Sequence, residues 1–202
     1  MYSCIELRSP TGRLRLARPS PSEDAAVLRN RTHPDTRKYV KFFPEHLTMD
    51  EVRQLRESRA KDSTVVDFNI HLITGNEMGE EVFAGTTGCF NLNEEFKSCE
   101  VGILIVPQFH RGGIATEAIY TVLKWIFEEK RLHRVTFETA IDNLPMQTWL
   151  DGVAGARLEA WRRECWRNID GSYTDVRGYS ILEQEWSGSV KQRLEAKLRI
   201  KV

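Results

Sequence analysis

Residues 100–130 read EVGILIVPQFHRGGIATEAIYTVLKWIFEEK, and this stretch decides the fold. Its first part is rich in β-branched residues and ends at Pro107, which cannot donate a hydrogen bond to a sheet, so we expect a buried strand there. Beyond Gly112 and Gly113, apolar residues recur every three or four positions, as a helix facing the core requires. These residues are Ile114, Ala118, Ile119, Val122, Leu123, Ile126 and Phe127. The stretch therefore predicts a strand, a glycine turn and a helix in succession.

The glycine turn directly precedes the predicted helix, where an anion can bind. The first turn of a helix leaves backbone N–H groups without intrahelical partners, and the helix dipole adds positive potential. Glycines also let a phosphate approach the backbone closely. A glycine turn is equally common as a plain connection, so the turn alone indicates a ligand only weakly. An ATP site of the P-loop type is disfavoured, because Ile114 and Ala115 stand where such a loop carries Lys and Ser or Thr.

The string HRGGIA at residues 110–115 resembles the acetyl-coenzyme A signature of the GCN5-related N-acetyltransferases (GNATs). That signature is Gln or Arg, two variable residues, Gly, one variable residue, then Gly or Ala. The following Thr-Glu-Ala is typical of the branch that resembles the ribosomal-protein N-terminal acetyltransferases. One departure is the histidine, which stands where Gln or Arg is usual. The resemblance implies that the coenzyme pyrophosphate is held by His110, Arg111, Gly112, Gly113, Ile114, Ala115 and Thr116.

The resemblance covers about residues 13–186 and implies an α/β fold. In this family a single mixed, largely antiparallel central sheet is flanked by helices, and two central strands splay apart. We therefore expect a GNAT domain over residues 1–186. The last strand of the family resembles residues 175–186, and a short break follows at 187–189. Val190, Leu194 and Leu198 then share one helical face, which predicts a helical extension over residues 187–202 packed on the same domain.

The flanking segments supply the remaining elements of the sheet and its helices. Thr48 and Glu51 form a capping box, so a helix should begin there. Alternating or β-branched runs predict strands, with turn-forming residues between them. We expect strands at 13–18, 68–73, 82–90 and 134–139 and a turn at 74–79. The resemblance to the family implies further strands at 157–166 and 175–186, joined by a turn at 168–171.

The resemblance also implies how the coenzyme is held above the sheet. Backbone N–H groups of Ile103, Leu104 and Ile105, on the splayed strand, stabilise the oxyanion that forms from the thioester carbonyl. In this family an Asn after the next strand hydrogen-bonds the coenzyme arm, and Asn143 matches it. The segment after Asn143 is one residue longer than usual, so its register differs from the family pattern.

Acetyl transfer to an amine requires a proton acceptor, because an α-amine titrates near about 8 and a lysine near about 10.4. Glu138 is the first candidate. It stands five residues before Asn143, the relation of the catalytic Glu and Asn in the resembled branch. A solvated carboxylate at a sheet edge is an equally good interpretation. Glu100, which opens the splayed strand, is the second candidate, and either residue could act through a water molecule.

The general acid is the least defined role. Many relatives carry a Tyr one or two helical turns beyond the Asn, but Trp149 and Leu150 occupy that region here. Tyr173 or Tyr179 could substitute only if the fold brings one of them near the sulfur. Protonation of the leaving thiolate by solvent is the simpler hypothesis.

Composition limits the classes of partner. The 202 residues hold 29 Lys plus Arg and 29 Asp plus Glu, so no overall charge attracts the chain to nucleic acid or to a membrane. The four cysteines lack a short paired spacing and the five histidines form no helical ligand pair, so we expect no metal. With no signal peptide and no apolar run of membrane length, a cytoplasmic protein with reduced thiols is expected.

The resemblance leads to two hypotheses for the function. The first is an acetyl-CoA-dependent N-acetyltransferase, in which a primary amine of a protein N-terminus or a small molecule attacks the thioester directly. Such an enzyme would bind acetyl-CoA and an amine, and would be a monomer or a homodimer. The alternative is a non-catalytic acyl-CoA-binding regulatory module, which His110 and the missing tyrosine favour.

Overall fold

The computed structural model describes residues 5–74 and 80–200. In this part of the chain one sheet of eight strands has the order β1-β2-β3-β4-β5-β6-β8-β7. All neighbouring strands are antiparallel except β5 and β6, which are parallel. The predicted fold class, a mixed and largely antiparallel sheet with flanking helices, is confirmed. The strands are β1 (Leu7–Arg8), β2 (Leu14–Ala17), β3 (Val66–Thr74), β4 (Glu80–Asn93), β5 (Ser98–Ile105), β6 (Arg134–Ala140), β7 (Arg157–Arg167) and β8 (Tyr173–Leu182).

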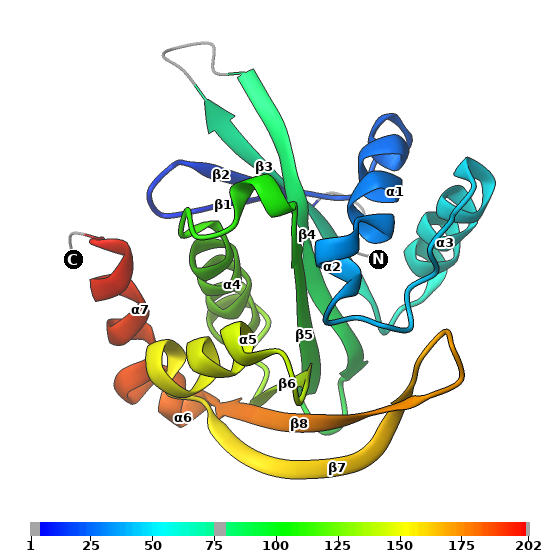
Figure 1. Ribbon diagram of the computed structural model, residues 1–202. Helices are drawn as coiled ribbons and strands as arrows, with labels where there is room; N and C mark the ends of the chain where they lie inside the picture. The colour runs from blue at the N-terminus through cyan, green and yellow to red at the C-terminus, as the bar shows by residue number, and fades with distance from the viewer. Residues whose placement is uncertain (1–4, 75–79, 201–202) are drawn as a thin grey trace.

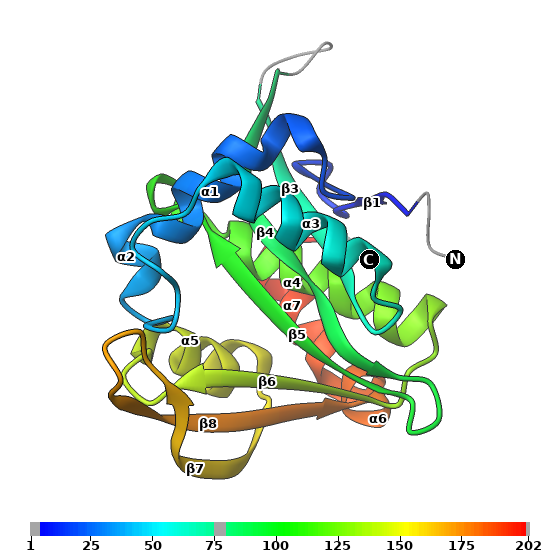
Figure 2. The same cartoon turned by 90° about the vertical axis from the view of Figure 1, so that its right-hand side faces the viewer.

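Strands β5 and β6 separate soon after they begin. Their pairing runs from Ser98 with Arg134 to Glu100 with Thr136, after which β5 continues to Ile105 and β6 to Ala140 without each other. Figure 2 shows the two strands diverging toward their carboxyl ends. This is the predicted splay. Beyond Glu100, one edge of β5 therefore has no neighbouring strand among the described residues.

Helices cover both faces of the sheet, with α4 and α7 on one side and α1, α2 and α3 on the other (Figure 1). Helix α4 has the predicted buried apolar face and is followed by the short helix η3. Thr48 and Glu51 form the predicted capping box of α3. The helices are η1 (Pro21–Glu23), α1 (Asp24–Thr32), α2 (Pro34–Arg37), α3 (Met49–Lys61), η2 (Pro107–Phe109), α4 (Ile114–Lys124), η3 (Trp125–Glu129), α5 (Leu144–Thr148), η4 (Trp149–Ala154), α6 (Glu183–Glu185), η5 (Trp186–Val190) and α7 (Lys191–Leu198).

The C-terminal path differs from the prediction in two places. Strand β8 ends at Leu182 rather than at residue 186, and no break follows, because α6, η5 and α7 run on continuously. The Glu185 carboxylate accepts a hydrogen bond from the Leu182 N–H at 2.9 Å and so begins the helical segment. The Trp186 ring then stacks on Phe127, with ring centroids 5.6 Å apart. Burial of the Trp186 ring against Phe127 therefore favours a helical segment after Leu182 over a longer strand.

The last helix contacts the rest of the domain through its apolar face. Trp186, Val190 and Leu194 belong to the buried core, and Leu198 packs against it. The Tyr120 hydroxyl donates to Glu195 at 2.8 Å. The turn predicted at residues 74–79 lies outside the described residues apart from Thr74, which ends β3.

Candidate functional site

The glycine turn leads into α4 with two residues in the left-handed region. Arg111 has φ 63° and Gly113, the N-cap of α4, has φ 78°. A glycine N-cap has no side chain to satisfy the first-turn N–H groups, so those of Ile114, Ala115 and Thr116 remain open to a ligand. These N–H groups and the helix dipole fit the negative charge of a pyrophosphate.

Arg13, the residue just before β2, contacts the glycine turn and stabilises it. Its guanidinium donates to the Gly112 carbonyl at 3.2 Å and pairs with Glu117 at 3.2 Å. Glu117 is 1% exposed and also accepts from the Thr11 hydroxyl. Sequence reasoning missed this support, because nothing near Arg13 in the chain indicates that it meets residue 112.

Three of the residues predicted to bind the coenzyme also have structural partners. The His110 ring donates through Nε2 to the Ile105 carbonyl at 3.0 Å, which ties the turn to the end of β5. The Thr116 hydroxyl accepts from the Trp149 indole at 3.0 Å, so this side chain joins α4 to η4. The Asn143 side chain accepts from the Met146 N–H at 3.2 Å and caps α5. In the described part of the chain its amide nitrogen has no hydrogen-bond partner, so it can still donate to a ligand.

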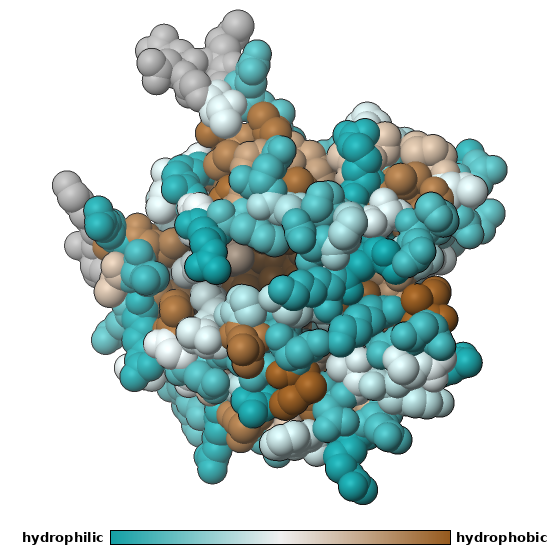
Figure 3. Space-filling model, viewed as in Figure 1, coloured by the Kyte–Doolittle hydropathy of each residue, from teal (hydrophilic) through white to brown (hydrophobic). Residues whose placement is uncertain are grey.

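A cavity of about 580 Å³ opens where β5 and β6 diverge. That volume lies within the roughly 300–1,000 Å³ typical of small-molecule sites. The space-filling view in Figure 3 also shows a hollow with a hydrophobic floor on the face that carries α5 and the start of α4, but no residue of the glycine turn or of α4 lines the cavity itself. The cavity is lined by Ile103 and Leu104 on β5, by Glu100 and Glu138, and by Asn143. The splay therefore brings together the predicted oxyanion strand, both candidate bases and the predicted asparagine.

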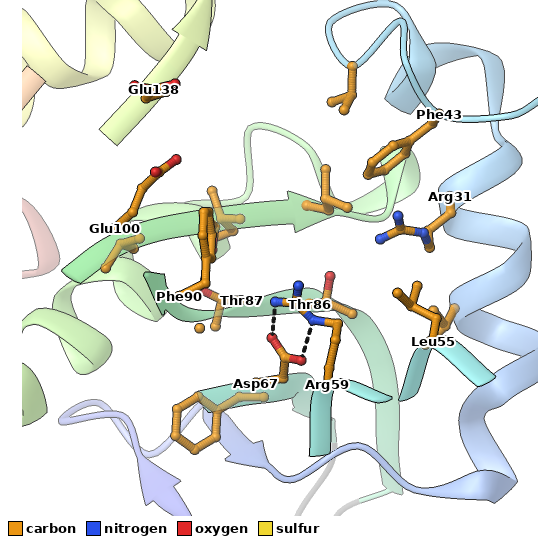
Figure 4. Close-up of a pocket in the computed structure, with 18 of the residues that line it drawn as sticks. Arg31, Phe43, Leu55, Arg59, Asp67, Thr86, Thr87, Phe90, Glu100 and Glu138 are labelled. Carbon is orange, nitrogen blue, oxygen red and sulfur yellow. Dashed lines mark hydrogen bonds and ion pairs between the residues drawn. The ribbon is translucent and has the colours of Figure 1, made fainter. Parts of the chain in front are cut away.

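Glu100 has an unusual electrostatic environment. Burial, followed by the negative charge of Glu138, raises the pKa of its carboxyl to about 7. The Asn91 amide donates to it at 3.2 Å and acts in the opposite direction. Glu138 instead pairs with Arg162 at 2.8 Å. Figure 4 shows the two carboxylates on neighbouring strands at one end of the cavity.

Arg162 is a further residue that sequence reasoning missed. It lies on β7, and its guanidinium reaches Glu138 across β8 at the position of Gly178, the register partner of Glu138. A Cβ at Gly178 would lie 2.5 Å from the Arg162 Nη1 atom, so a larger residue there would displace the arginine. Gly178, which lies opposite Glu138 on β8, is the residue that leaves room for Arg162. The sequence alone does not show this, because it does not give the register between β6 and β8.

Neither tyrosine considered as a general acid lies in the cavity. Tyr179 is 1% exposed, belongs to the core and donates to Asp151 at 3.4 Å. Tyr173 is 55% exposed and is the first residue of β8, where it lies opposite Arg167 of β7 in the sheet. Protonation of the leaving thiolate by solvent therefore stays the simpler prediction. Tyr39, from the connection after α2, does line the cavity.

Residues 5–74 and 80–200 contain no group of three or more His, Cys, Asp or Glu side chains arranged to hold a metal ion. No helix in this part of the chain has the length and hydropathy needed to cross a bilayer.

Comparisons with known proteins agree with this fold. A family model described as "Acetyltransferase (GNAT) domain" matches residues 13–151. The chain is 25% identical over 175 residues to "Putative ribosomal N-acetyltransferase YdaF" of Bacillus subtilis (strain 168), covering 87% of this chain and 93% of that protein. A solved "putative acetyltransferase" from T. thermophilus is 28% identical with a TM-score of 0.80, covering 98% of this chain and 100% of that one. Spermidine N-acetyltransferase from Vibrio cholerae, solved with CoA and spermine, has a TM-score of 0.74 at 20% identity, covering 87% of this chain and 99% of that one.

Proposed function

Since the chain belongs to the GNAT family of N-acetyltransferases, we propose that it moves an acetyl group from acetyl-CoA directly to a primary amine, with Glu100 as general base. The observation that carries this proposal is the Glu100 carboxyl, whose pKa is raised to about 7 at the splay of β5 and β6. General bases work best when their pKa lies near the operating pH. Glu138, the first candidate from sequence, is engaged by Arg162 and serves to raise the pKa of its neighbour.

The coenzyme fits two groups of backbone donors. The open first turn of α4 would hold the pyrophosphate, and the unpaired edge of β5 from Ile103 to Ile105 would face the thioester carbonyl. Asn143 would donate its free amide nitrogen to the coenzyme arm. Bound acetyl-CoA supplies the activated acetyl group that the amine attacks.

The proton balance requires one base in the protein. As the N–C bond forms, an amine proton passes to Glu100, directly or through a water molecule. The C–S bond breaks, and the thiolate takes a proton from solvent, because neither Tyr173 nor Tyr179 reaches the cavity. Glu100 then returns its proton to solvent, which a carboxyl with a pKa near 7 does readily at neutral pH.

The names of the relatives suggest two kinds of acceptor. The name of the Bacillus subtilis relative refers to ribosomal protein, whereas the Vibrio cholerae enzyme acts on spermidine. Both acceptors present a primary amine, which is the group that the proposed mechanism requires.

The test is calorimetric titration with acetyl-CoA, followed by thiol release in the presence of peptides and small amines. Micromolar binding together with acceptor-dependent thiol release is the expected result. Binding without release from any acceptor would contradict the enzyme and favour a regulatory acyl-CoA-binding module. A matched titration with ATP, which should not bind, controls for general anion affinity of the α4 terminus.

A further inference from the structure

The cavity wall opposite the two glutamates carries three arginines. Two of them are already neutralised. Arg59 binds Asp67 through two contacts of 2.6 and 2.7 Å, and Arg56 binds Asp24 through contacts of 2.9 and 3.1 Å. All four of these side chains line the cavity. Each pair is a planar two-point interaction, so each aspartate already holds a guanidinium, although the charge of Asp67 still acts on Arg31.

Arg31, the third arginine, has no such partner. It comes from α1, and its guanidinium carbon lies 3.9 Å from the centroid of the Phe43 ring. Its Nε atom is buried without a hydrogen bond, and no carboxylate within residues 5–74 and 80–200 forms an ion pair with it. Burial, followed by the charge of Arg59, lowers the pKa of Arg31 to about 10. Figure 4 shows the guanidinium projecting into the cavity beside Phe43.

The cavity is therefore charged at both ends. Arg31 lies at one end, beside Leu55, and Glu100 and Glu138 lie at the other (Figure 4). Phe90, Thr86 and Thr87 lie between the two ends, above the Arg59–Asp67 pair. A buried guanidinium without a partner is costly, and an anion that enters the cavity removes that cost through charge-assisted hydrogen bonds.

We propose that the acceptor is an amine that also carries a carboxylate, and that Arg31 binds this carboxylate while the amine lies at Glu100. This inference rests on the proposed function and adds the class of substrate. The carboxylate must lie several bonds from the amine to span the cavity, as in a free ω-amino acid or in an acidic residue near a peptide N-terminus, and both present the same two charges. Arg31 is a specificity residue in this assignment and takes no part in the proton transfer.

A polycation such as spermidine fits this cavity poorly. A second cationic group would lie near Arg31, and Asp24 and Asp67 are occupied by Arg56 and Arg59. Desolvated like charges at close range repel strongly. Spermidine should therefore be the weakest acceptor in a panel matched for amine chemistry.

The turnover test uses acceptor pairs that differ only in charge. One arm compares 5-aminopentanoate with 5-aminopentanamide, and the other compares peptides with Glu or Gln at the second position. We expect kcat/KM to favour the carboxylate form in one arm by about 10- to 100-fold, as a hydrogen-bonded charge pair would give, and that arm identifies the source. Arg31→Gln should reduce the ratio to near one by raising KM for the carboxylate form alone. Arg29→Gln, an exposed arginine on the same helix, is the matched control.

A binding measurement separates this inference from the proposed function. Calorimetry with the CoA-saturated protein gives the Kd of each acceptor in wild type, Arg31→Gln and Arg31→Lys without any chemistry. Arg31-dependent binding of the carboxylate form in the absence of turnover would overturn the proposed reaction and keep the assignment of Arg31. Turnover with equal kcat/KM for both forms, a preference for spermidine, or a ratio unchanged in Arg31→Gln would overturn the assignment. If the protein shows neither turnover nor Arg31-dependent binding, the proposed reaction and the assignment of Arg31 are both overturned.

Discussion

Glu100 and Glu138 lie together where β5 and β6 separate, and their partners differ. Arg162 binds Glu138 at 2.8 Å, whereas Glu100 accepts a hydrogen bond from the neutral amide of Asn91 at 3.2 Å. The charge of Glu138 and the burial of Glu100 both raise the pKa of Glu100, to about 7. Glu100 is therefore placed to exchange a proton at neutral pH, and the charge of Glu138 raises the pKa of Glu100.

Glu100→Gln should lower kcat by about 10²- to 10⁴-fold, the usual contribution of a general base. Deprotonated Glu100 is the active form, so wild-type kcat should rise as pH increases through about 7. The variant should lose that dependence and keep its affinity for acetyl-CoA. Thiol release across pH and calorimetry make the two measurements. If Glu138→Gln loses orders of magnitude and Glu100→Gln does not, Glu138 is the base.

Two neighbouring substitutions should move the pH profile in opposite directions. Glu138→Gln removes a negative charge that raises the pKa of Glu100, so the rise in kcat should shift to lower pH. Arg162→Gln removes a positive charge that lowers the same pKa, so the rise should shift to higher pH. The profiles of kcat against pH at fixed ionic strength test this. Shifts of the same sign in both variants would contradict the electrostatic coupling.

Gly113→Val should abolish measurable acetyl-CoA binding. Gly113 has φ 78°, a conformation that costs a residue with a Cβ about 1–2 kcal/mol and a β-branched residue more. The turn would shift and misplace the first N–H groups of α4. Gly171→Ala, at φ 86° in the β7–β8 turn, provides strain of the same kind away from the site and should leave the Kd unchanged. Retained affinity in Gly113→Val would disprove the placement of the pyrophosphate.

Leu194→Ala should lower the free energy of unfolding by about 2–5 kcal/mol, the cost of a cavity in a packed core. Leu194 is 0% exposed on α7 and contacts the common core, so we propose that residues 187–202 stabilise the same domain. Lys197→Ala, on the exposed side of the same helix, should change the free energy by less than about 0.5 kcal/mol. Equal midpoints of urea denaturation for the two variants would show that α7 is not part of the cooperative unit.

Local patterns were sufficient for the central part of the fold. Pro107 at the end of a β-branched run, the glycines of the turn and the spacing from Ile114 to Phe127 predicted β5, the turn and α4. The path after Leu182 was predicted wrongly, because the burial of Trp186 against Phe127 outweighs the local extended pattern. The support that Arg13 gives to Gly112 was missed for the same reason, since it depends on contacts between distant segments.

The sequence by itself determined the family signature and the strand-turn-helix unit, which depend on residue types at short spacing, where backbone conformational preferences act. The two candidate bases came from the resemblance to the family. Only the tertiary structure distinguishes the surroundings of the two glutamates and shows that Arg31 has no ion-pair partner among the described residues. A pKa and an unpaired charge depend on which side chains from α1, β4, β6 and β7 come together, and on how much water they exclude. Those quantities are set by packing over the whole chain.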